Sequence, residues 1–277
     1  MRKFIKFVIF LGIILVLAGG AIVGYAAYKG MFGPVNYEQK EFVTEEDFSN
    51  IKINLETIDV EFVKSDDTKC TIKYETEDGY EQTFDVKNNT LEVIESYKLK
   101  WYETLFRWNF RNHKMSIALP KDVYDEVSLT ISTGDVDIED FSFEKMNLKA
   151  STGDINLAQV HVASTLNISV STGKVTLDYV TADSAAINSS TGEIKLSNTV
   201  FMGALSIKTS TGDVRFTKSD AKTIDVKTST GDIKGDILTP KSFDAKASTG
   251  EVHVPSTTGE ACTLRTSTGD IRITISE

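Results

Sequence analysis

The stretch LSIKTSTGDVRFT, residues 205–217, contains the pattern that decides the fold. Leu205, Ile207 and Val214 belong to an apolar series that alternates with polar residues on both sides of Gly212. This alternation has the period of a β-strand, because successive side chains of a strand point to opposite faces. Gly212 suits a tight corner, since glycine adopts positive φ without a steric cost. The stretch therefore predicts two short strands joined at a Ser-Thr-Gly corner.

The same pattern occurs eight times at intervals of 19 or 20 residues. Its corner glycines are Gly134, Gly153, Gly173, Gly192, Gly212, Gly231, Gly250 and Gly269. A unit this short cannot bury a core by itself, so stacked copies must share one. The sequence thus predicts an all-β chain, a parallel β-solenoid in which like residues form columns spaced about 4.8 Å apart. The eight regular rungs would make a rod of roughly 38 Å.

The repeat also predicts how the chain is divided. Residues 1–35 would be a transmembrane anchor and short linker, residues 36–127 an elaborated N-terminal cap with degenerate rungs, and residues 128–277 the regular repeats. Ile51 lies 76 residues, or four repeat lengths, before Val127. Further alternating strands are expected at Cys70-Ile72-Tyr74, Leu91-Val93 and Met115-Ile117-Leu119.

The N-terminus carries an apolar segment of 22 uncharged residues, from Phe7 to Tyr28. As a helix it would be roughly 33 Å long, enough to cross a hydrocarbon core of about 30 Å. Arg2, Lys3 and Lys6 precede it, so the positive-inside rule places the N-terminus in the cytoplasm and the bulk of the chain outside. A cleaved signal peptide is the alternative, but the long apolar core favours an uncleaved single-pass anchor.

Composition excludes several classes of function. The chain has 30 Lys+Arg against 40 Asp+Glu, a net charge of −10, which argues against nucleic-acid binding. Three His and two Cys leave little material for a zinc site or disulfides, and Cys262 falls in an inward column, where we expect a buried free thiol. A catalytic serine needs one base and one group that orients the base, whereas this sequence repeats eight equivalent serines. No enzyme activity and no cofactor is therefore expected.

The Ser-Thr-Gly-Asp rungs behind a single membrane segment resemble the bacterial putative-adhesin domain family. The resemblance covers about residues 40–277 and includes the strand Met115 to Lys121. It implies an extracytoplasmic protein of the cell envelope that serves in adhesion or in the envelope-stress response, and it implies no known catalytic residue. The chain departs from the usual corner at Lys174 and Gly235.

An acidic column follows the corner glycines and is interrupted by Lys174. Stacked carboxylates could bind Ca²⁺. Basic residues two positions further along can neutralise the acids of the later rungs. We therefore expect a solvated, mutually compensated face and no metal site.

A basic column lies four residues before the glycines. Its candidate polyanion stripe is Lys208, Lys227, Lys246 and Arg265. A plain solvated face is the alternative. As a functional site, the stripe would dock an anionic cell-envelope polymer outside the membrane.

A basic and aromatic segment, residues 97–114, lies in an acidic surround. Its candidate membrane or ligand patch is Trp101, Tyr102, Phe106, Arg107, Trp108 and Arg111. Trp and Tyr favour the headgroup region, and basic groups add attraction to anionic lipid. The alternative is a cap in which Trp101, Leu105 and Trp108 cover the open end of the core.

Two hypotheses of function follow. The first is a membrane-anchored binding protein whose partners are the membrane and an envelope polymer or membrane protein. The second is a structural or regulatory protein that self-associates through an exposed edge. That edge is expected at Ile273–Ile275, because the last predicted strand has no capping segment beyond it.

Overall fold

The computed structural model describes residues 2–28, 37–77, 80–97 and 113–276. The helix α1 (Arg2–Tyr28) precedes a chain that is otherwise built of strands, so the prediction of a mainly β protein behind an N-terminal apolar helix is confirmed. The first part of the β region contains β1 (Tyr37–Thr44), β2 (Asn50–Lys64), β3 (Cys70–Glu77), β4 (Tyr80–Lys87), β5 (Thr90–Tyr97) and β6 (His113–Leu119). Within α1, the segment Phe4–Tyr25 is long and apolar enough to cross a membrane.

The repeated part alternates long and short strands. The strands are β7 (Val123–Thr133), β8 (Val136–Glu139), β9 (Ser142–Thr152), β10 (Ile155–Ala158), β11 (His161–Thr172), β12 (Val175–Asp178), β13 (Thr181–Thr191), β14 (Ile194–Ser197), β15 (Val200–Thr211), β16 (Val214–Thr230), β17 (Ile233–Ile237), β18 (Lys241–Thr249), β19 (Val252–His253), β20 (Glu260–Thr268) and β21 (Ile271–Ile275). We call a rung the long strand, its glycine corner and the short strand that follows. Long strands pair in sheet B and short strands in sheet A.

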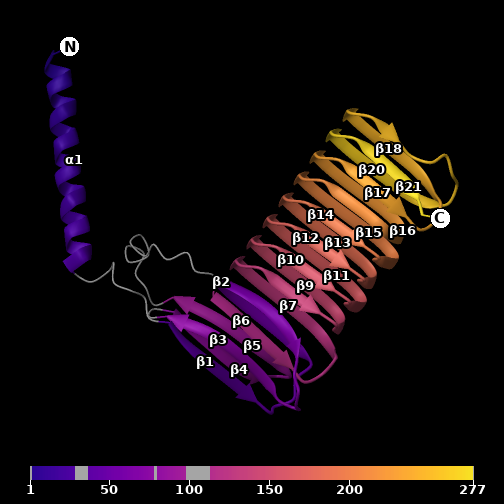
Figure 1. Ribbon diagram of the computed structural model, residues 1–277, viewed down its shortest axis with the longest axis horizontal. Coiled ribbons are helices and arrows are strands. Elements are labelled where there is room, and N and C mark those ends of the chain that lie inside the picture. The colour runs from indigo at the N-terminus through magenta and orange to yellow at the C-terminus, as the bar shows by residue number, and fades with distance from the viewer. Residues whose placement is uncertain (1, 29–36, 78–79, 98–112, 277) are drawn as a thin grey trace.

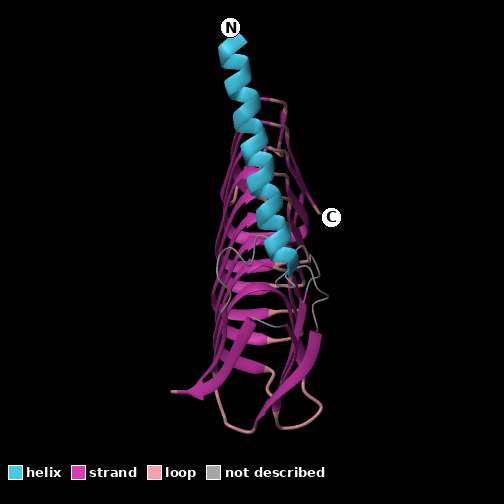
Figure 2. Ribbon diagram, turned by 90° about the vertical axis from the view of Figure 1, so that its left-hand side faces the viewer, coloured by secondary structure: helices cyan, strands magenta, loops and turns pink. Residues whose placement is uncertain are grey.

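Neighbouring rungs pair in parallel with like positions opposite each other. Leu148 of β9 is opposite Ile168 of β11, and Ile155 of β10 is opposite Val175 of β12. Figure 1 shows the rungs stacked side by side into a rod, and Figure 2 shows the two layers of strands. The 19- or 20-residue period of the sequence thus becomes the offset between paired strands.

The core lies between the two sheets and follows the inward columns. Leu129, Ile168 and Ile207, each five residues before its corner glycine, are no more than 1% exposed. The buried residues form one continuous hydrophobic cluster from Phe48 to Ile273. Stacking buries each apolar side chain against like side chains above and below, which supplies the core that a single rung lacks.

The N-terminal end of the rod begins with a rung that has no glycine. β2 pairs with both β7 and β8, and Ile51 is opposite Val127 as the four-repeat spacing predicts. On its other side β2 pairs in parallel with β5 and β6. The alternating strands predicted at residues 70–74, 91–93 and 115–119 are confirmed as β3, β5 and β6.

Antiparallel strands close this end. β1 pairs with β3, and β4 pairs with β5. Phe84 of β4 stacks against Phe42 of β1 with ring centroids 5.2 Å apart, and it also contacts Tyr74 at 4.7 Å. Rings at these separations contribute more than their buried area alone. The aromatic contacts therefore cover the last parallel rung.

The C-terminal end corrects the predicted order of the rungs. β20 pairs with β16 on one side and with β18 on the other, and β21 likewise lies between β17 and β19. The last repeat of the sequence is therefore inserted between the two repeats that precede it. The prediction that Ile273–Ile275 belong to the terminal rung is wrong, because the terminal rung is β18 with β19. β19 pairs only with Ile271 and Arg272 of β21, and Ile273–Ile275 pair with β17 alone.

Burial gives a physical reason for this order. The inserted rung contributes Leu264, Ile271 and Ile273, all at most 4% exposed. The terminal rung contributes smaller or half-buried groups such as Ala245. Each buried aliphatic side chain contributes about 1.5–3 kcal/mol, so placing the more apolar rung inside and the weaker one at the end buries more apolar surface.

A buried ion pair joins β18 of the terminal rung to β16, across the inserted rung. Lys241 Nζ on β18 lies 2.9 Å from Asp220 Oδ1 on β16, and both side chains are at most 6% exposed. Lys241 also donates to the carbonyl of Ala221 at 2.7 Å and to Thr239 Oγ1 at 2.8 Å. A buried charge is tolerated only when it is paired and hydrogen-bonded, and here both conditions hold.

Both cysteines are buried and free, as expected for Cys262. Burial raises the pKa of each thiol to about 12. Neither sulfur is therefore a thiolate near neutral pH, and neither Cys70 nor Cys262 is a nucleophile.

All eight corner glycines have positive φ, between 135° and 152°. A β-carbon on Gly212 would lie 1.9 Å from the carbonyl oxygen of Gly192 in the neighbouring rung. Such a contact is far shorter than any van der Waals separation. The corner therefore requires glycine both for its conformation and for the close approach of the next rung.

Replacement of Gly212 by alanine is expected to destabilise the rod by about 3 kcal/mol or more, because the backbone must move to relieve both strain and overlap. The measurement is chemical denaturation of the full chain in detergent. Gly203→Ala is the matched control, because its β-carbon would lie 3.0 Å from the nearest atom and its φ is not positive. Equal denaturation midpoints for the two variants would contradict this account of the corner.

Candidate functional site

The basic stripe predicted from the sequence forms a continuous ladder on sheet B. Lys208 is opposite Lys227, Lys227 is opposite Arg265, and Arg265 is opposite Lys246. The four residues are neighbours as predicted, but Arg265 and Lys246 exchange places because the last rung is inserted. The three lysines are exposed and Arg265 is half-buried.

Two members of this basic ladder are neutralised by carboxylates on their own face. Lys227 Nζ lies 3.2 Å from Asp225, and Arg265 forms an ion pair with Asp244. Among the described residues, Lys208 and Lys246 form no ion pair. Like charges about 4.8 Å apart repel by roughly 0.9 kcal/mol even in water. An anion that contacts neighbouring cations of the ladder would reduce this repulsion.

The same column continues as a polar groove toward the N-terminal end. The groove has a volume of about 390 Å³ and is lined by Thr130, Ile131, Lys149, Ala150, Ser151, Ser169, Val170, Ser171, Asn188, Ser189 and Ser190. Its outward groups are mainly hydroxyls and one amide, with Lys149 the single cation among them. One column of sheet B thus passes from neutral hydrogen-bonding groups to positive charge along the rod.

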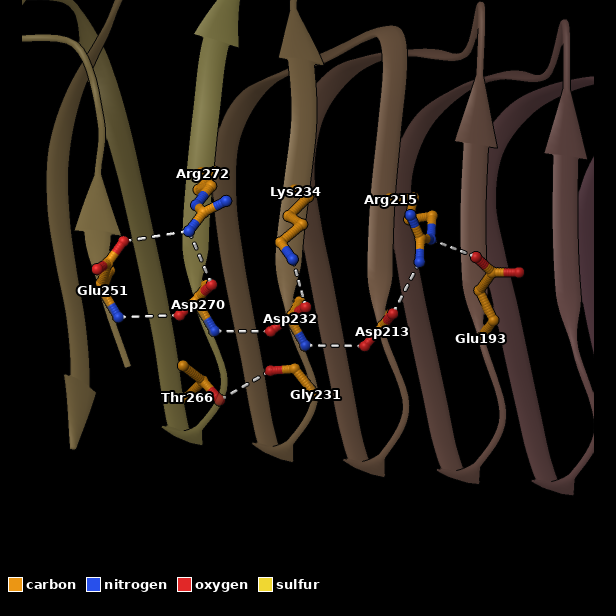
Figure 3. A network of polar contacts seen from close by, with 10 residues as sticks. All are labelled: Glu193, Asp213, Arg215, Gly231, Asp232, Lys234, Glu251, Thr266, Asp270 and Arg272. Carbon is orange, nitrogen blue, oxygen red and sulfur yellow. Dashed lines mark hydrogen bonds and ion pairs between the residues drawn. The ribbon is translucent and has the colours of Figure 1, made fainter. Parts of the chain in front are cut away.

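The acidic column lies across the glycine corner, on sheet A. Asp213 Oδ1 accepts the backbone N–H of Asp232 at 2.9 Å, and Asp232 Oδ1 accepts that of Asp270 at 2.7 Å. Figure 3 shows this relay continuing to Glu251, whose N–H lies 3.0 Å from Asp270 Oδ1. Each carboxylate therefore satisfies an amide that the corner leaves without a strand partner.

A second run of the same relay lies at the other end of the column. Asp59 accepts the N–H of Asp135 at 2.9 Å, Asp135 that of Asp154 at 2.7 Å, and Asp154 that of Lys174 at 2.7 Å. Sequence reasoning missed this role. The preference for Asp over Glu at this position could have signalled it, because the shorter side chain reaches an adjacent amide.

The column also carries ion pairs with the basic residues two positions further along. Lys234 contacts Asp232 at 2.5 Å, and Arg272 contacts both Asp270 and Glu251 at 3.1 Å. These contacts match the compensated face expected from the sequence. Within the described ranges, no group of three or more His, Cys, Asp or Glu side chains could hold a metal ion.

The relay is interrupted where Lys174 replaces the acid. Glu193, in the next rung, pairs instead with Lys174 at 3.1 Å and Arg215 at 2.5 Å. Burial raises the pKa of Glu193, but the hydrogen bonds and charges of Lys174 and Arg215 outweigh it and the pKa is lowered overall. Ion pairs are thus found at this point of the column, between the two runs of the relay.

The histidines do not form a catalytic arrangement with the repeated serines. His161 Nδ1 lies 2.8 Å from Thr181 Oγ1, and His253 Nε2 lies 3.2 Å from Glu251. His113 is buried near Glu75, 3.8 Å away. The six residues of the predicted aromatic patch, Trp101, Tyr102, Phe106, Arg107, Trp108 and Arg111, lie outside the described residues.

Comparison with known proteins gives a family and a fold. The Toastrack DUF4097 family profile matches residues 48–205 and 165–277. A structure titled putative adhesin, from Bacteroides fragilis NCTC 9343, is 20% identical with a TM-score of 0.56, and the match covers 86% of this chain and 97% of that one. A structure titled putative lipid binding protein, from Parabacteroides distasonis ATCC 8503, is 16% identical with a TM-score of 0.51 at the same coverage. A search of curated proteins finds no match.

The aspartate relay makes stability depend on pH. The hydrogen bond from Lys234, followed by that from the Asp270 amide, lowers the pKa of Asp232. A carboxyl whose pKa is lower in the folded state stabilises the fold above its unfolded pKa, and this contribution is lost as the pH falls through the folded value.

We expect Asp232→Asn to reduce the loss of stability between about pH 5 and pH 2, because the amide oxygen can still accept the Asp270 N–H but carries no charge to titrate. The measurement is the denaturation midpoint as a function of pH. Asp66→Asn, at an exposed loop residue, is the control. Identical pH profiles for wild type and Asp232→Asn would show that the relay carries no charge-dependent stability.

Proposed function

The chain belongs to the Toastrack DUF4097 family, and from that premise we propose that it is a membrane-anchored binding protein of the bacterial cell envelope. In this proposal α1 is an uncleaved single-pass anchor with a cytoplasmic N-terminus. The β-solenoid lies outside the membrane and binds an anionic envelope polymer along its basic ladder. The family and the solved structure titled putative adhesin support a non-enzymatic binding role.

The observation that carries the proposal is the register of the basic ladder. Parallel pairing aligns Lys208, Lys227, Arg265 and Lys246 along the rod, one cation for each strand. A linear polyanion that runs along the rod could contact all four without bending. Because long-range charge attraction is screened by salt, such binding should weaken as ionic strength rises.

The anchor follows from the sequence and composition of α1. Phe4–Tyr25 is apolar throughout apart from Lys6, and every side chain described within it is exposed. A helix without a protein partner for its apolar surface is stable in lipid but not in water. The excess of basic residues before it supports the cytoplasmic N-terminus. A role in the envelope-stress response stays a prediction of the family resemblance.

Charge reversal tests the proposed ladder. Lys208→Glu with Lys246→Glu should lower the salt concentration at which the full-length protein elutes from immobilised long-chain inorganic polyphosphate. These two lysines have no ion pair of their own among the described residues, so the change removes positive charge without breaking an internal contact. Lys145→Glu with Lys222→Glu is the matched control, because both are exposed on sheet B outside the ladder and the net charge changes equally. Elution of both double variants at one salt concentration would reject the ladder as the binding site.

The terminal rung supports a second candidate function, self-association. β18 pairs only with β20, and β19 only with β21, within the described chain. Val252 is 39% exposed at this open edge, and Phe243 and Val254 are only partly buried. An uncovered edge of this kind is a template for pairing with a second copy.

If the edge mediates self-association, the wild-type mass in nanodiscs should rise with concentration and Val252→Glu should keep the protein monomeric, because a charge at the edge opposes pairing. Analytical ultracentrifugation measures the mass. Val123→Glu is the control, since Val123 is 65% exposed elsewhere on the rod. A monomeric wild type, or an associating Val252→Glu variant, would exclude pairing through this edge.

A further inference from the structure

A shallow hollow lies at the second corner of the rungs, where each short strand of sheet A turns back into sheet B. Its volume is about 580 Å³, and it is lined by Asp140, Gln159, Val160, His161, Tyr179 and Thr181. Val160 is buried, whereas the other five side chains are exposed. The volume falls within the range of about 300–1,000 Å³ that is usual for small-ligand sites.

Tyr179 has an unusual conformation for its side chain. Its φ is 52°, in the left-handed region. The corresponding corners at Asp140, Gln159, Asn198 and Lys218 also have positive φ, between 44° and 62°. The short polar side chains of Asp140 and Asn198 suit that region, whereas Gln159 and Lys218 share the strain of Tyr179. A bulky residue there is an outlier that costs conformational energy.

The ring of Tyr179 makes little packing contact within the fold. The side chain of Tyr179 is 59% exposed, and it stacks on no aromatic ring among the described residues. The positive φ is a property of this corner in each rung from Asp140 to Lys218, and what distinguishes Tyr179 is an aromatic ring that the fold leaves exposed. An exposed tyrosine offers a rigid apolar face and a hydroxyl at low entropic cost.

Polar groups surround this ring on neighbouring rungs. His161 begins β11, and its Nδ1 lies 2.8 Å from Thr181 Oγ1, which begins β13. That contact orients the imidazole and leaves its other nitrogen without a partner in the described chain. The side-chain amide of Gln159 likewise makes no hydrogen bond to a described residue, whereas its backbone N–H donates to the Asp178 carbonyl at 2.9 Å. These groups are available to donate and accept hydrogen bonds beside the ring.

A second hollow adjoins the first and sets the charge of the site. It has a volume of about 330 Å³ and shares Asp140 and Gln159 with the first. Glu61, Asp137 and Glu139 also line it, against one cation, Lys64, which pairs with Asp140 at 2.6 Å. The walls are therefore mainly acidic, so an anionic ligand is repelled.

We propose that these hollows bind an uncharged glycan, with one pyranose ring stacked on Tyr179. The C–H face of a sugar is apolar and weakly positive, which complements the negative face of an aromatic ring. Gln159, His161 and Thr181 hydrogen-bond the sugar hydroxyls, and the chain of sugars continues toward Asp140. This site lies at the second corner, whereas the basic ladder lies on the long strands of sheet B, and it does not depend on the polyanion proposal.

The test uses the full-length protein in lipid nanodiscs, so that no sugar-based detergent competes. Saturation-transfer NMR is recorded with chitotetraose, cellotetraose and maltotetraose. At least one tetrasaccharide should bind, and Tyr179→Ala should weaken that binding by about two- to tenfold, the range that a stacked ring contributes. Tyr179→Phe should keep most of the binding because it keeps the ring.

Tyr179→Asn separates a binding role from a structural one. Asn occupies the equivalent corner at position 198 with φ of 50°, so this variant should melt at or above the wild-type temperature while losing the glycan. A lower melting temperature would assign the tyrosine a structural role and reject the proposal. Unchanged binding by Tyr179→Asn, or no binding of any of the three tetrasaccharides by the wild type, would also overturn it.

Discussion

At each glycine corner of the rod, the α-carbon of the glycine lies against a carbonyl oxygen of the neighbouring rung. A β-carbon at any of the eight positions would come within 1.9 to 2.1 Å of that oxygen. This approach holds adjacent rungs in one register, because a shift of one residue would place a side chain into the contact. All the columns of the rod, apolar or charged, inherit their alignment from it.

The corner creates a second requirement, which the aspartates meet. A tight turn leaves backbone amides without strand partners, and an unpaired buried amide is costly. The carboxylate of one rung accepts the amide of the next, as Asp213 and Asp232 do in Figure 3. Threonines make the complementary contact on the inner side, since Thr266 Oγ1 donates to the Gly231 carbonyl at 3.0 Å. The polar groups at the glycine corners therefore already form hydrogen bonds within the fold.

Function is consequently left to positions that neither the core nor the corner needs. The outward column of sheet B can vary from Ser169 to Lys227 without disturbing the stack, because those side chains face solvent. The second corner tolerates residues as different as Asp140, Gln159 and Tyr179. Both proposed binding sites lie on such columns. A rod of this design can acquire a ligand site by changing one column while its core and corner glycines stay the same.

The amino-acid sequence by itself determined the strand alternation, the repeat length, the parallel register, the burial of Cys262 and the membership of the basic ladder. It could do so because these properties depend on residue type at fixed spacing. The order of the last two rungs was decided only by the tertiary structure. Their repeats are compatible in register with either order, and the difference depends on the burial of Leu264 and Ile273 and on the contact between Lys241 and Asp220. The aspartate relay and the hollow beside Tyr179 were likewise beyond sequence reasoning, because both join residues about 20 positions apart through distances that exist only once the rungs are stacked.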